Sequence, residues 1–320
     1  AEDPPQSQRM TQEPIPPHWP GELVTVGGEH QVFVRSTPDR GGEPALCVHG
    51  LAGSSRNWTD LGDLLRPRLA CDALDLPGFG DSPPRPDRRY SIAALAQTVA
   101  ALIERKNNAP VHLIANSLGG AVAVKVAATR PELVKTLTLI SPALPDSRPH
   151  LDQVQFAVVS LPGIGARLIR KHDTLPPENR VADVIGNCFS DPSRFPEERF
   201  ADEVAELAQR DTLDYATAAL IGTIRTLTAD FFRKGRHTAW RDAARITAPT
   251  LVIYGSHDRV VDPRMAGRAA HAFANSRIVV LPRTGHLAHM EHPEQVAAEM
   301  TIMLDATAQR AREFPLAPAG

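Results

Sequence analysis

Short apolar runs alternate with amphipathic segments along much of this chain, and the alternation predicts strands joined by helices. Residues 22–26 and 31–36 flank Gly27-Gly28, which predicts a β-hairpin. The later expected strands are continuous apolar runs, at 44–49, 70–76, 111–116, 136–141, 250–255 and 277–282. Continuous apolar strands connected by helices indicate an α/β fold with a mostly parallel central sheet covered on both faces.

Helices are expected between these strands. The clearest one begins after Ser91, a good N-cap residue, and keeps one face apolar. The other expected helices of the alternating part are at roughly 57–66, at 118–129, from Asp262 onward and at 293–310.

The alternation stops between Ala143 and about Ile246, where only helix-like segments separated by Pro and Gly occur. These segments are 151–160, roughly 178–188, 197–209 and 212–230. Because the strand pattern resumes at Pro249, the interval is interpreted as an insertion between two strands of one sheet. The expected organisation is a Pro-rich arm at 1–20, a core at 21–142 and 247–312, a helical cap at 143–246, and a tail at 313–320.

Charge and composition exclude several classes of protein. The 320 residues include 35 basic and 37 acidic side chains, a formal net charge of −2, which argues against an electrostatic nucleic-acid binder or a polybasic membrane-surface protein. No apolar run approaches the roughly 20 residues of a membrane span. Residues 1–20 lack the apolar segment of a signal peptide, so a cytoplasmic location is expected, with an already cleaved signal peptide left open.

Ser117 stands between an expected strand and an expected helix with no loop between them. Such a sharp reversal forces the central residue into a strained backbone conformation and requires small residues two positions before and after it. Ala115 and Gly119 meet this requirement, and Gly120 leaves further room for helix packing. The turn presents the serine hydroxyl at a helix N-terminus, where the helix dipole favours developing negative charge. Ser117 is therefore the candidate nucleophile, and the alternative is an ordinary serine N-cap.

His286 follows the last expected strand, and Asp258 lies three residues after the strand before it. In a serine hydrolase, the histidine takes the serine proton at Nε2 while a carboxylate holds its Nδ1–H. Asp262 competes with Asp258 for the second role, but it precedes a proline and is interpreted as a helix N-cap. The order Ser117, Asp258, His286 along the chain is the order that a strand-turn-helix nucleophile requires.

Attack on a carbonyl also requires N–H donors for the oxyanion that forms. The N–H of Leu118, directly after the nucleophile, is one candidate, and the N–H of Leu51 is the other. Gly50 allows this backbone segment to approach the nucleophile closely. His49 is interpreted as a residue that orients the segment through hydrogen bonds, with a role as a second base as the weaker alternative.

A metal site is the competing interpretation of His286, His289 and His292, which are spaced three residues apart. Gly285 and Pro293 make this segment a loop, and no cysteine or carboxylate cluster completes a zinc set. We therefore expect no metal and no cofactor, and structural roles for His289 and His292.

These motifs together resemble those of the α/β-hydrolase superfamily, from about Gly21 to Arg310. The segments that carry the resemblance are HGLAGSSRNW (49–58), DLPGFGDS (75–82), ANSLGGAVA (115–123), YGSHDRVVDP (254–263) and GHLAHMEHPE (285–294). The resemblance implies a triad of Ser117, His286 and Asp258, with an oxyanion hole at Leu51 and Leu118 and a helical cap. The chain departs from the usual nucleophile motif at Ala115, where glycine is usual.

A serine nucleophile favours attack on a carbonyl and an acyl-enzyme that water resolves. The expected activity is hydrolysis of small to medium apolar carboxylic esters in a pocket without a strong field. The main alternative is a carbon–carbon hydrolase of dienoic ring-fission products, because Asn116-Ser117 is similar to the nucleophile motif of that subgroup. Leu287 stands where that subgroup usually has tryptophan. A lactonase, a cofactor-free perhydrolase and a slow-turnover ligand receptor on the same scaffold also stay open.

The residues that select the substrate are expected in the cap and around the nucleophile. Segment 154–169 is apolar and broken by Pro162-Gly163, so it either lines an acyl pocket as a bending lid or packs the cap onto the core. Phe231-Phe232 is expected in the pocket wall or in the core of the cap. The candidate substrate-binding residues are His49, Gly50, Asn116, Phe156, Leu161 and Leu287. The expected partner is a small-molecule ester, with no nucleic acid and no membrane insertion, and the chain is either a monomer or a homodimer.

Overall fold

The computed structural model describes residues 15–28, 30–39, 41–106, 109–146, 158–232 and 238–313. Its centre is an eight-stranded sheet with the order β1-β2-β4-β3-β5-β6-β7-β8. The strands are β1 (Gly21–Val26), β2 (His30–Ser36), β3 (Glu43–Val48), β4 (Leu69–Leu74), β5 (Val111–Asn116), β6 (Val134–Ile140), β7 (Thr250–Gly255) and β8 (Ser276–Leu281). β2 pairs antiparallel with β1 and β4, and all other neighbours are parallel. The expected α/β fold with a mostly parallel sheet is confirmed.

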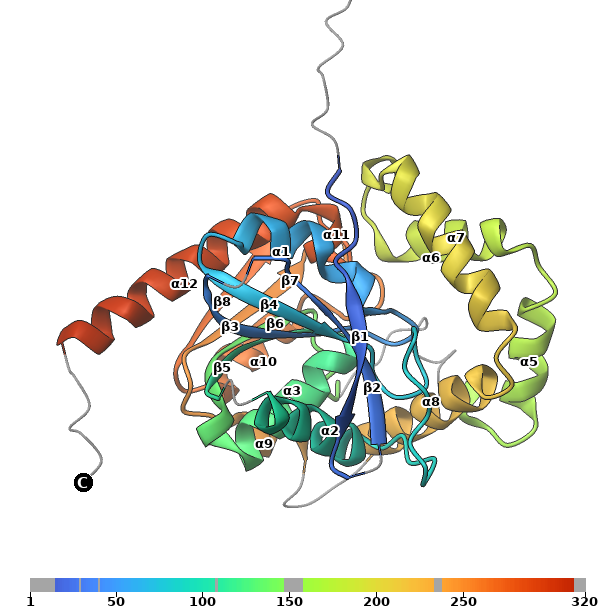
Figure 1. The fold of residues 1–320 in the computed structure, drawn as a ribbon, viewed down its shortest axis with the longest axis horizontal. Coiled ribbons are helices and arrows are strands. Elements are labelled where there is room, and N and C mark those ends of the chain that lie inside the picture. The colour runs from blue at the N-terminus through green and yellow to red at the C-terminus, as the bar shows by residue number, and fades with distance from the viewer. Residues whose placement is uncertain are drawn as a thin grey trace, which may run out of the picture.

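Helices cover both faces of this sheet (Figure 1). One face packs against α2 (Ile92–Arg105), α3 (Leu118–Thr129), α9 (Ala239–Ala243) and α10 (Met265–Ala272). The other face packs against α1 (Thr59–Leu65), α11 (Ala288–Glu291) and α12 (Pro293–Glu313). Short 3-10 turns, η1 (Ser55–Trp58) and η2 (Pro131–Leu133), precede α1 and β6. The inner strands β4, β5, β6 and β7 are therefore buried on both faces, which is why they are nearly continuous apolar runs in the sequence.

Local signals explain where several elements begin and end. The Ser91 hydroxyl accepts a hydrogen bond from the N–H of Ala94 at 3.2 Å and so caps α2. Gly27 and Gly28 have φ values of 57° and 106°, a left-handed conformation that glycine adopts without strain, and they connect β1 to β2.

The long segment between the neighbouring strands β6 and β7 forms helices and no strand within its described residues. These are α5 (Ile164–His172), α6 (Pro177–Cys188), the 3-10 turn η3 (Pro192–Arg194), α7 (Glu197–Asp211) and α8 (Ala216–Phe232), followed by α9. α5 to α8 lie together at one side of the sheet (Figure 1). Val181, Ile185 and Phe189 form a small hydrophobic cluster of their own here, separate from the two clusters of the sheet.

Pro162-Gly163 interrupts the helical structure of its segment as expected, because residues 158–160 are helical, 161–163 form a turn and α5 begins directly after Gly163. One local expectation is wrong. Asp262 is not the N-cap of α10, since that helix begins at Met265 and its cap residue is Arg264. The Asp262 carboxylate instead accepts the N–H of Arg264 at 2.8 Å in the turn before the helix. Of the expected helix at 151–160, only 158–160 belong to the described residues, and they are helical.

No helix in the described part of the chain combines the length and the apolar composition needed to cross a membrane.

α3 passes so close to β3 that position 119 has no room for a side chain. A Cβ on Gly119 would lie 2.3 Å from the carbonyl oxygen of Val48 and 2.5 Å from that of His49. Both neighbours are backbone atoms, so no side-chain rotation relieves the contact. Gly119 therefore fixes the first turn of α3 against the end of β3.

Replacing Gly119 by alanine is expected to lower the free energy of unfolding by about 1–3 kcal/mol, because the strand or the helix must shift to admit the methyl group. Gly186→Ala in α6 is the matched control: its Cβ would meet nothing within 4 Å, and alanine favours a helix by about 1 kcal/mol. Urea unfolding followed by circular dichroism measures both variants. Equal effects of the two substitutions would contradict the packing argument.

Candidate active site

Ser117 is the single residue between β5 and α3. Its backbone has φ 51° and ψ −116°, a strained combination for any residue other than glycine, and its side chain makes no capping hydrogen bond to the helix. The alternative interpretation as an ordinary serine N-cap is therefore wrong. The backbone N–H of Ser117 donates to the carbonyl of Ile140 at 3.0 Å, which ties the turn to the end of β6.

His286 and Asp258 meet beyond the carboxyl ends of β8 and β7. The Nδ1 of His286 lies 2.9 Å from Oδ2 of Asp258, and both side chains are buried. Because a carboxylate only accepts hydrogen bonds, the neutral imidazole carries its proton on Nδ1 and leaves Nε2 free to accept one. The other carboxylate oxygen accepts the N–H groups of Val260 and Val261 at 2.8 and 2.9 Å.

Asp258 is held in its charged form. Burial alone would raise the pKa of this carboxyl, but the charge and hydrogen bond of His286 and the N–H of Val261 outweigh burial and lower the pKa. Asp258 therefore stays an ionised carboxylate beside the imidazole of His286 throughout the neutral pH range.

Ser117 and His286 line the same cavity, which has a volume of about 660 Å³. No hydrogen bond joins the serine hydroxyl to the imidazole among the described residues. Such contacts are commonly long or misaligned without substrate, so the shared cavity is the informative observation. A volume of this size accommodates a small to medium organic molecule.

The two expected oxyanion donors lie on either side of the nucleophile. Leu118 begins α3, so its N–H has no acceptor within the helix. Neither this N–H nor that of Leu51 has a hydrogen-bond acceptor in the described part of the chain. A Cβ on Gly50 would lie 2.7 Å from Oδ1 of Asn116 and 3.2 Å from Cβ of Ser117, so glycine is required where this segment passes the nucleophile.

His49 does not line the cavity and is fully buried. The N–H of Leu76 donates to its Nε2 at 2.9 Å, so the proton of the neutral ring is on Nδ1, which donates to the carbonyl of Gly50 at 2.7 Å. Burial lowers the pKa of His49 despite the nearby Asp75. Both nitrogens are thus occupied, and the ring orients the loop as expected. The alternative roles of His49 in substrate binding and as a second base have no support in this geometry.

Asn116 was expected near the substrate and lies in the cavity wall, but its side-chain NH2 group is hydrogen-bonded to backbone carbonyls. It donates to the carbonyl of Ile140 at 3.1 Å and to that of His286 at 3.3 Å. Asn116 therefore links the nucleophile turn to the histidine loop.

Most of the cavity wall is apolar, and most of its residues come from the segment between β6 and β7. Leu287 and Gly50 lie in the wall as expected, and Phe231-Phe232 belongs to it as well. Leu161 does not, and its side chain is exposed, so its proposed contact with substrate is wrong. Phe156 lies outside the described residues.

One side of the cavity carries ionisable side chains. Glu203, Glu206 and Arg210 lie on one face of α7 and line the cavity. Asn57 donates to Glu203 at 3.3 Å. Glu206 accepts the hydroxyl of Ser54 at 3.0 Å. Burial, followed by repulsion from Glu206, raises the pKa of Glu203 to about 8.

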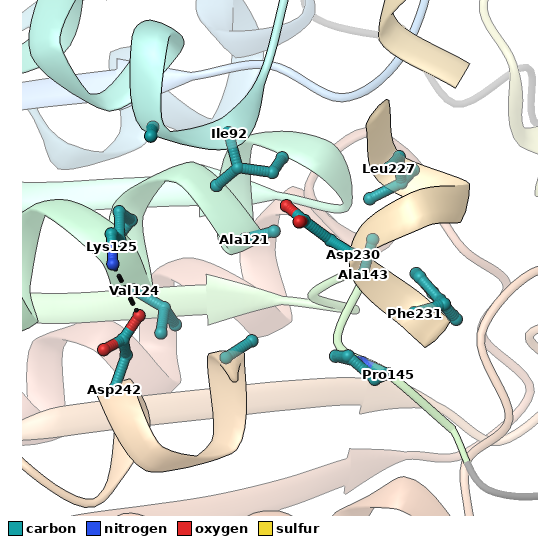
Figure 2. A pocket seen from close by; sticks show the side chains of 12 residues that line it. Ile92, Ala121, Val124, Lys125, Ala143, Pro145, Leu227, Asp230, Phe231 and Asp242 are labelled. Atoms are coloured by element: carbon teal, nitrogen blue, oxygen red, sulfur yellow. Dashed lines mark hydrogen bonds and ion pairs between the residues drawn. The ribbon is translucent and has the colours of Figure 1, made fainter. Parts of the chain in front are cut away.

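A second hollow of about 50 Å³ lies between α2, α3, α8 and α9 (Figure 2). Lys125 of α3 and Asp242 of α9 form an ion pair of 3.0 Å across it. The space is too small for an ester substrate, and the ion pair instead joins two helices of the same sheet face.

Glu291 is a residue of this region that the sequence did not reveal. Its buried carboxylate accepts the N–H of Gly285 at 2.6 Å, and those of Ser190 and Asp191 at 2.9 and 2.8 Å. Gly285 precedes the histidine, whereas Ser190 and Asp191 follow α6. No nearby sequence signal marks this pairing.

A second contact joins the same two segments. The N–H of His286 donates to the carbonyl of Cys188 at 2.6 Å. A Cβ on Gly285 would lie 2.3 Å from that carbonyl oxygen, so the close approach depends on glycine. The histidine loop and the end of α6 are therefore bound to each other through the main chain.

The neighbouring histidines have packing roles. His289 is buried and stacks on Trp58 with ring centroids 4.4 Å apart. Burial lowers its pKa to about 3. Nε2 of His292 lies 3.3 Å from the carbonyl oxygen of Arg283. The described residues contain no group of three potential metal ligands.

Comparisons with known proteins find several relatives and solved structures of similar fold. The dihydrolipoyllysine-residue acetyltransferase component of the acetoin cleaving system of Pseudomonas putida is 29% identical over 82% of this chain, which spans only 64% of that relative's length. A pimeloyl-[acyl-carrier protein] methyl ester esterase of Neisseria meningitidis serogroup B is 28% identical, covering 82% of this chain and 93% of the esterase. The solved structure of a meta-cleavage product hydrolase from Pseudomonas fluorescens superposes with a TM-score of 0.71 at 16% identity, covering 89% of this chain and 98% of that one. The last likeness shows the fold alone.

The sequence model of the alpha/beta hydrolase fold matches residues 44–293. That range contains the turn at Ser117, the carboxylate of Asp258 and the loop of His286. The chain therefore belongs to the α/β-hydrolase fold family.

Proposed function

We propose that this hydrolase cleaves carboxylic esters through an acyl-enzyme on Ser117. The observation that carries the proposal is the 2.9 Å contact between His286 and Asp258 in the cavity that the strained Ser117 also lines. A serine held in this backbone conformation beside a histidine of fixed tautomer is the arrangement that nucleophilic attack on a carbonyl requires.

The reaction follows from these positions. The Ser117 hydroxyl attacks the ester carbonyl and transfers its proton to Nε2 of His286, while Asp258 stabilises the resulting imidazolium. The N–H groups of Leu51 and Leu118 bind the oxyanion of the tetrahedral intermediate. The imidazolium then protonates the departing alcohol. Water attacks the acyl-enzyme with His286 as its base, releasing the carboxylic acid and restoring the serine.

The helices between β6 and β7 act in this proposal as a cap that selects the substrate, over residues 143–246. Support comes from the cavity wall, to which α6, α7 and α8 contribute apolar side chains including Val181, Ile224 and Leu227. Such a lining favours an acyl or alkyl group of small to medium size. The esterase among the relatives points to the same bond type.

Carbon–carbon hydrolysis of a dienoic ring-fission product is the second candidate. The Asn116-Ser117 pair, which is similar to the nucleophile motif of that subgroup, is the observation that favours it. A substrate panel distinguishes ester hydrolysis from carbon–carbon hydrolysis. It contains p-nitrophenyl esters of increasing acyl length and one ring-fission dienoate, and only the preferred class should be turned over repeatedly.

Ser117→Ala is expected to reduce turnover of p-nitrophenyl acetate and butyrate by at least about a thousandfold, since no other hydroxyl replaces the nucleophile. A fluorophosphonate should label the unmodified protein at Ser117, as identified by mass spectrometry of the peptides. Near-normal turnover by the variant, or labelling of another serine, would refute the proposed nucleophile.

Glu291→Gln is expected to lower kcat by about 10- to 100-fold with KM changed little, because the amide cannot accept all three N–H groups and His286 loses its position. Rates are expressed per active site, titrated with the fluorophosphonate, so that misfolded protein does not count. Glu294→Gln, which removes an exposed carboxylate on the same segment, is the control. If Glu291→Gln lowered the residual rate of a His286→Ala variant equally, the carboxylate would not act through the histidine.

The protonation of Glu203 predicts a dependence of stability on pH. The folded state retains this proton up to a pKa of about 8, whereas the ordinary value is 4.5. Between these values the folded protein binds more protons than the unfolded chain, so the free energy of unfolding should fall as pH rises through this window. Glu203→Gln should flatten that fall in urea unfolding, whereas Glu198→Gln, an exposed carboxylate on the same helix, should not. An unchanged slope for Glu203→Gln would contradict the prediction.

A further inference from the structure

The outer surface of the cap exposes a row of large apolar side chains. Leu161, Ile164, Leu168 and Leu175 are 46%, 48%, 43% and 40% exposed. Ile164 and Leu168 are four residues apart in α5 and so lie on one face of that helix. Leu161, Ile164 and Leu168 belong to the segment 154–169 that was expected to line a pocket or to pack the cap onto the core, but these three side chains are exposed and do not line the large cavity. Contiguous exposed apolar groups of this kind mark an interaction surface.

Cations lie along one side of this row. Arg167, Arg170 and Lys171 are exposed on α5, and none of them lies within ion-pair distance of an acidic side chain in the described part of the chain. The nearest acid in the sequence, Asp173, pairs instead with Arg180 at 3.2 Å. The surface therefore carries a local positive charge, although the whole chain has a formal net charge of −2. The formal net charge of the whole chain therefore does not describe the local charge of α5, which is positive.

α5 lies on the side of the cap away from the sheet (Figure 1). It packs against α8, whose last residue, Phe232, is 73% exposed and also lines the large cavity. Val184 of α6 likewise lines the cavity and is 53% exposed. Apolar side chains of the cap thus extend from its surface to the edge of the cavity that contains Ser117.

We propose that the outer face of α5, formed by Ile164, Leu168, Arg167, Arg170 and Lys171 together with Leu161 in the turn before the helix, docks on an anionic phospholipid surface. An amphipathic helix with apolar side chains beside a row of cations lies in the plane of a membrane interface: the apolar side chains enter the headgroup region, and the cations bind lipid phosphates. The long stems of Arg and Lys allow their charges to reach those phosphates while the helix lies deeper. The contact is peripheral and involves side chains of one helix face, and it does not depend on the proposed ester hydrolysis.

A second copy of this chain fits the surface less well. Two such faces would bring their cations together, and like charges across an interface are unfavourable. An anionic surface instead complements all three cations at once.

Co-sedimentation with lipid vesicles tests the proposal on the full chain. Vesicles of phosphatidylcholine containing about one third phosphatidylglycerol should bind the protein at low salt, pure phosphatidylcholine should bind it weakly, and added salt should release it. The triple variant Arg167→Gln, Arg170→Gln, Lys171→Gln should lose about fivefold in partitioning for each cation removed. Ile164→Ser with Leu168→Ser should weaken binding even at low salt.

Matched controls come from exposed residues outside the cap. Ile302→Ser replaces an apolar side chain on α12 that is 48% exposed, and the triple variant Arg105→Gln, Arg310→Gln, Arg312→Gln removes three exposed cations from α2 and α12. Neither should change vesicle binding. All variants should hydrolyse a soluble p-nitrophenyl ester at the unmodified rate, so that loss of docking is distinguished from failure of the proposed enzymatic function.

Several outcomes would overturn the docking surface. These are an absence of binding to anionic vesicles at low salt, equal binding by the α5 variants and the controls, or equal binding to neutral and anionic vesicles. Light scattering adds a further test: a dimer that Ile164→Ser with Leu168→Ser converts to a monomer would assign the face to a second copy instead.

Discussion

A residue other than glycine at a φ of 51° carries strain of about 1–3 kcal/mol, and Ser117 keeps this conformation because the backbone around it leaves no alternative. α3 starts one residue after β5, and its first turn touches the end of β3 where Gly119 has no side chain. The loop of Gly50 passes the other side of the serine just as closely. The position of the candidate nucleophile, and with it the N–H groups of Leu51 and Leu118, is therefore fixed by main-chain packing in the interior of the core.

The candidate base is positioned in a different way. His286 lies on a loop whose main chain is bound to the end of α6, through the carbonyl of Cys188 and through the carboxylate of Glu291. Ser117 is thus held by elements of the core alone, whereas the loop of His286 is also hydrogen-bonded to the end of α6. A displacement of the end of α6 would move His286 relative to Ser117, because these hydrogen bonds attach the histidine loop directly to that end of the helix. The proposed substrate selection by the cap and the proposed proton transfer by His286 are therefore connected through these few hydrogen bonds.

The parts of this site that the sequence predicted are those whose cause is local. The strand, Ser117 and α3 follow each other directly, and small residues around the serine signal the sharp turn. Glu291 was not predictable in this way, since its partner Ser190 is 101 residues away and an isolated glutamate gives no sign of three buried N–H groups. The apolar character of Leu161 predicted burial wrongly, because composition alone does not tell whether a residue in the turn before α5 faces the core or solvent.

The charges in the cavity wall are explained by how the cap is attached. One face of α7 holds the cap on the core: Arg199 binds Asp60, and Glu206 lies 3.4 Å from Arg56. Glu203 lies on the same face, between these two contacts along the helix, and so reaches the cavity wall. At neutral pH, Glu203 keeps its proton and Glu206 is compensated by Arg56, so these two carboxyl groups add little net field. An uncharged ester therefore suits this wall electrostatically even though its side chains are ionisable, and a substitution on this face would alter cap attachment and substrate preference together.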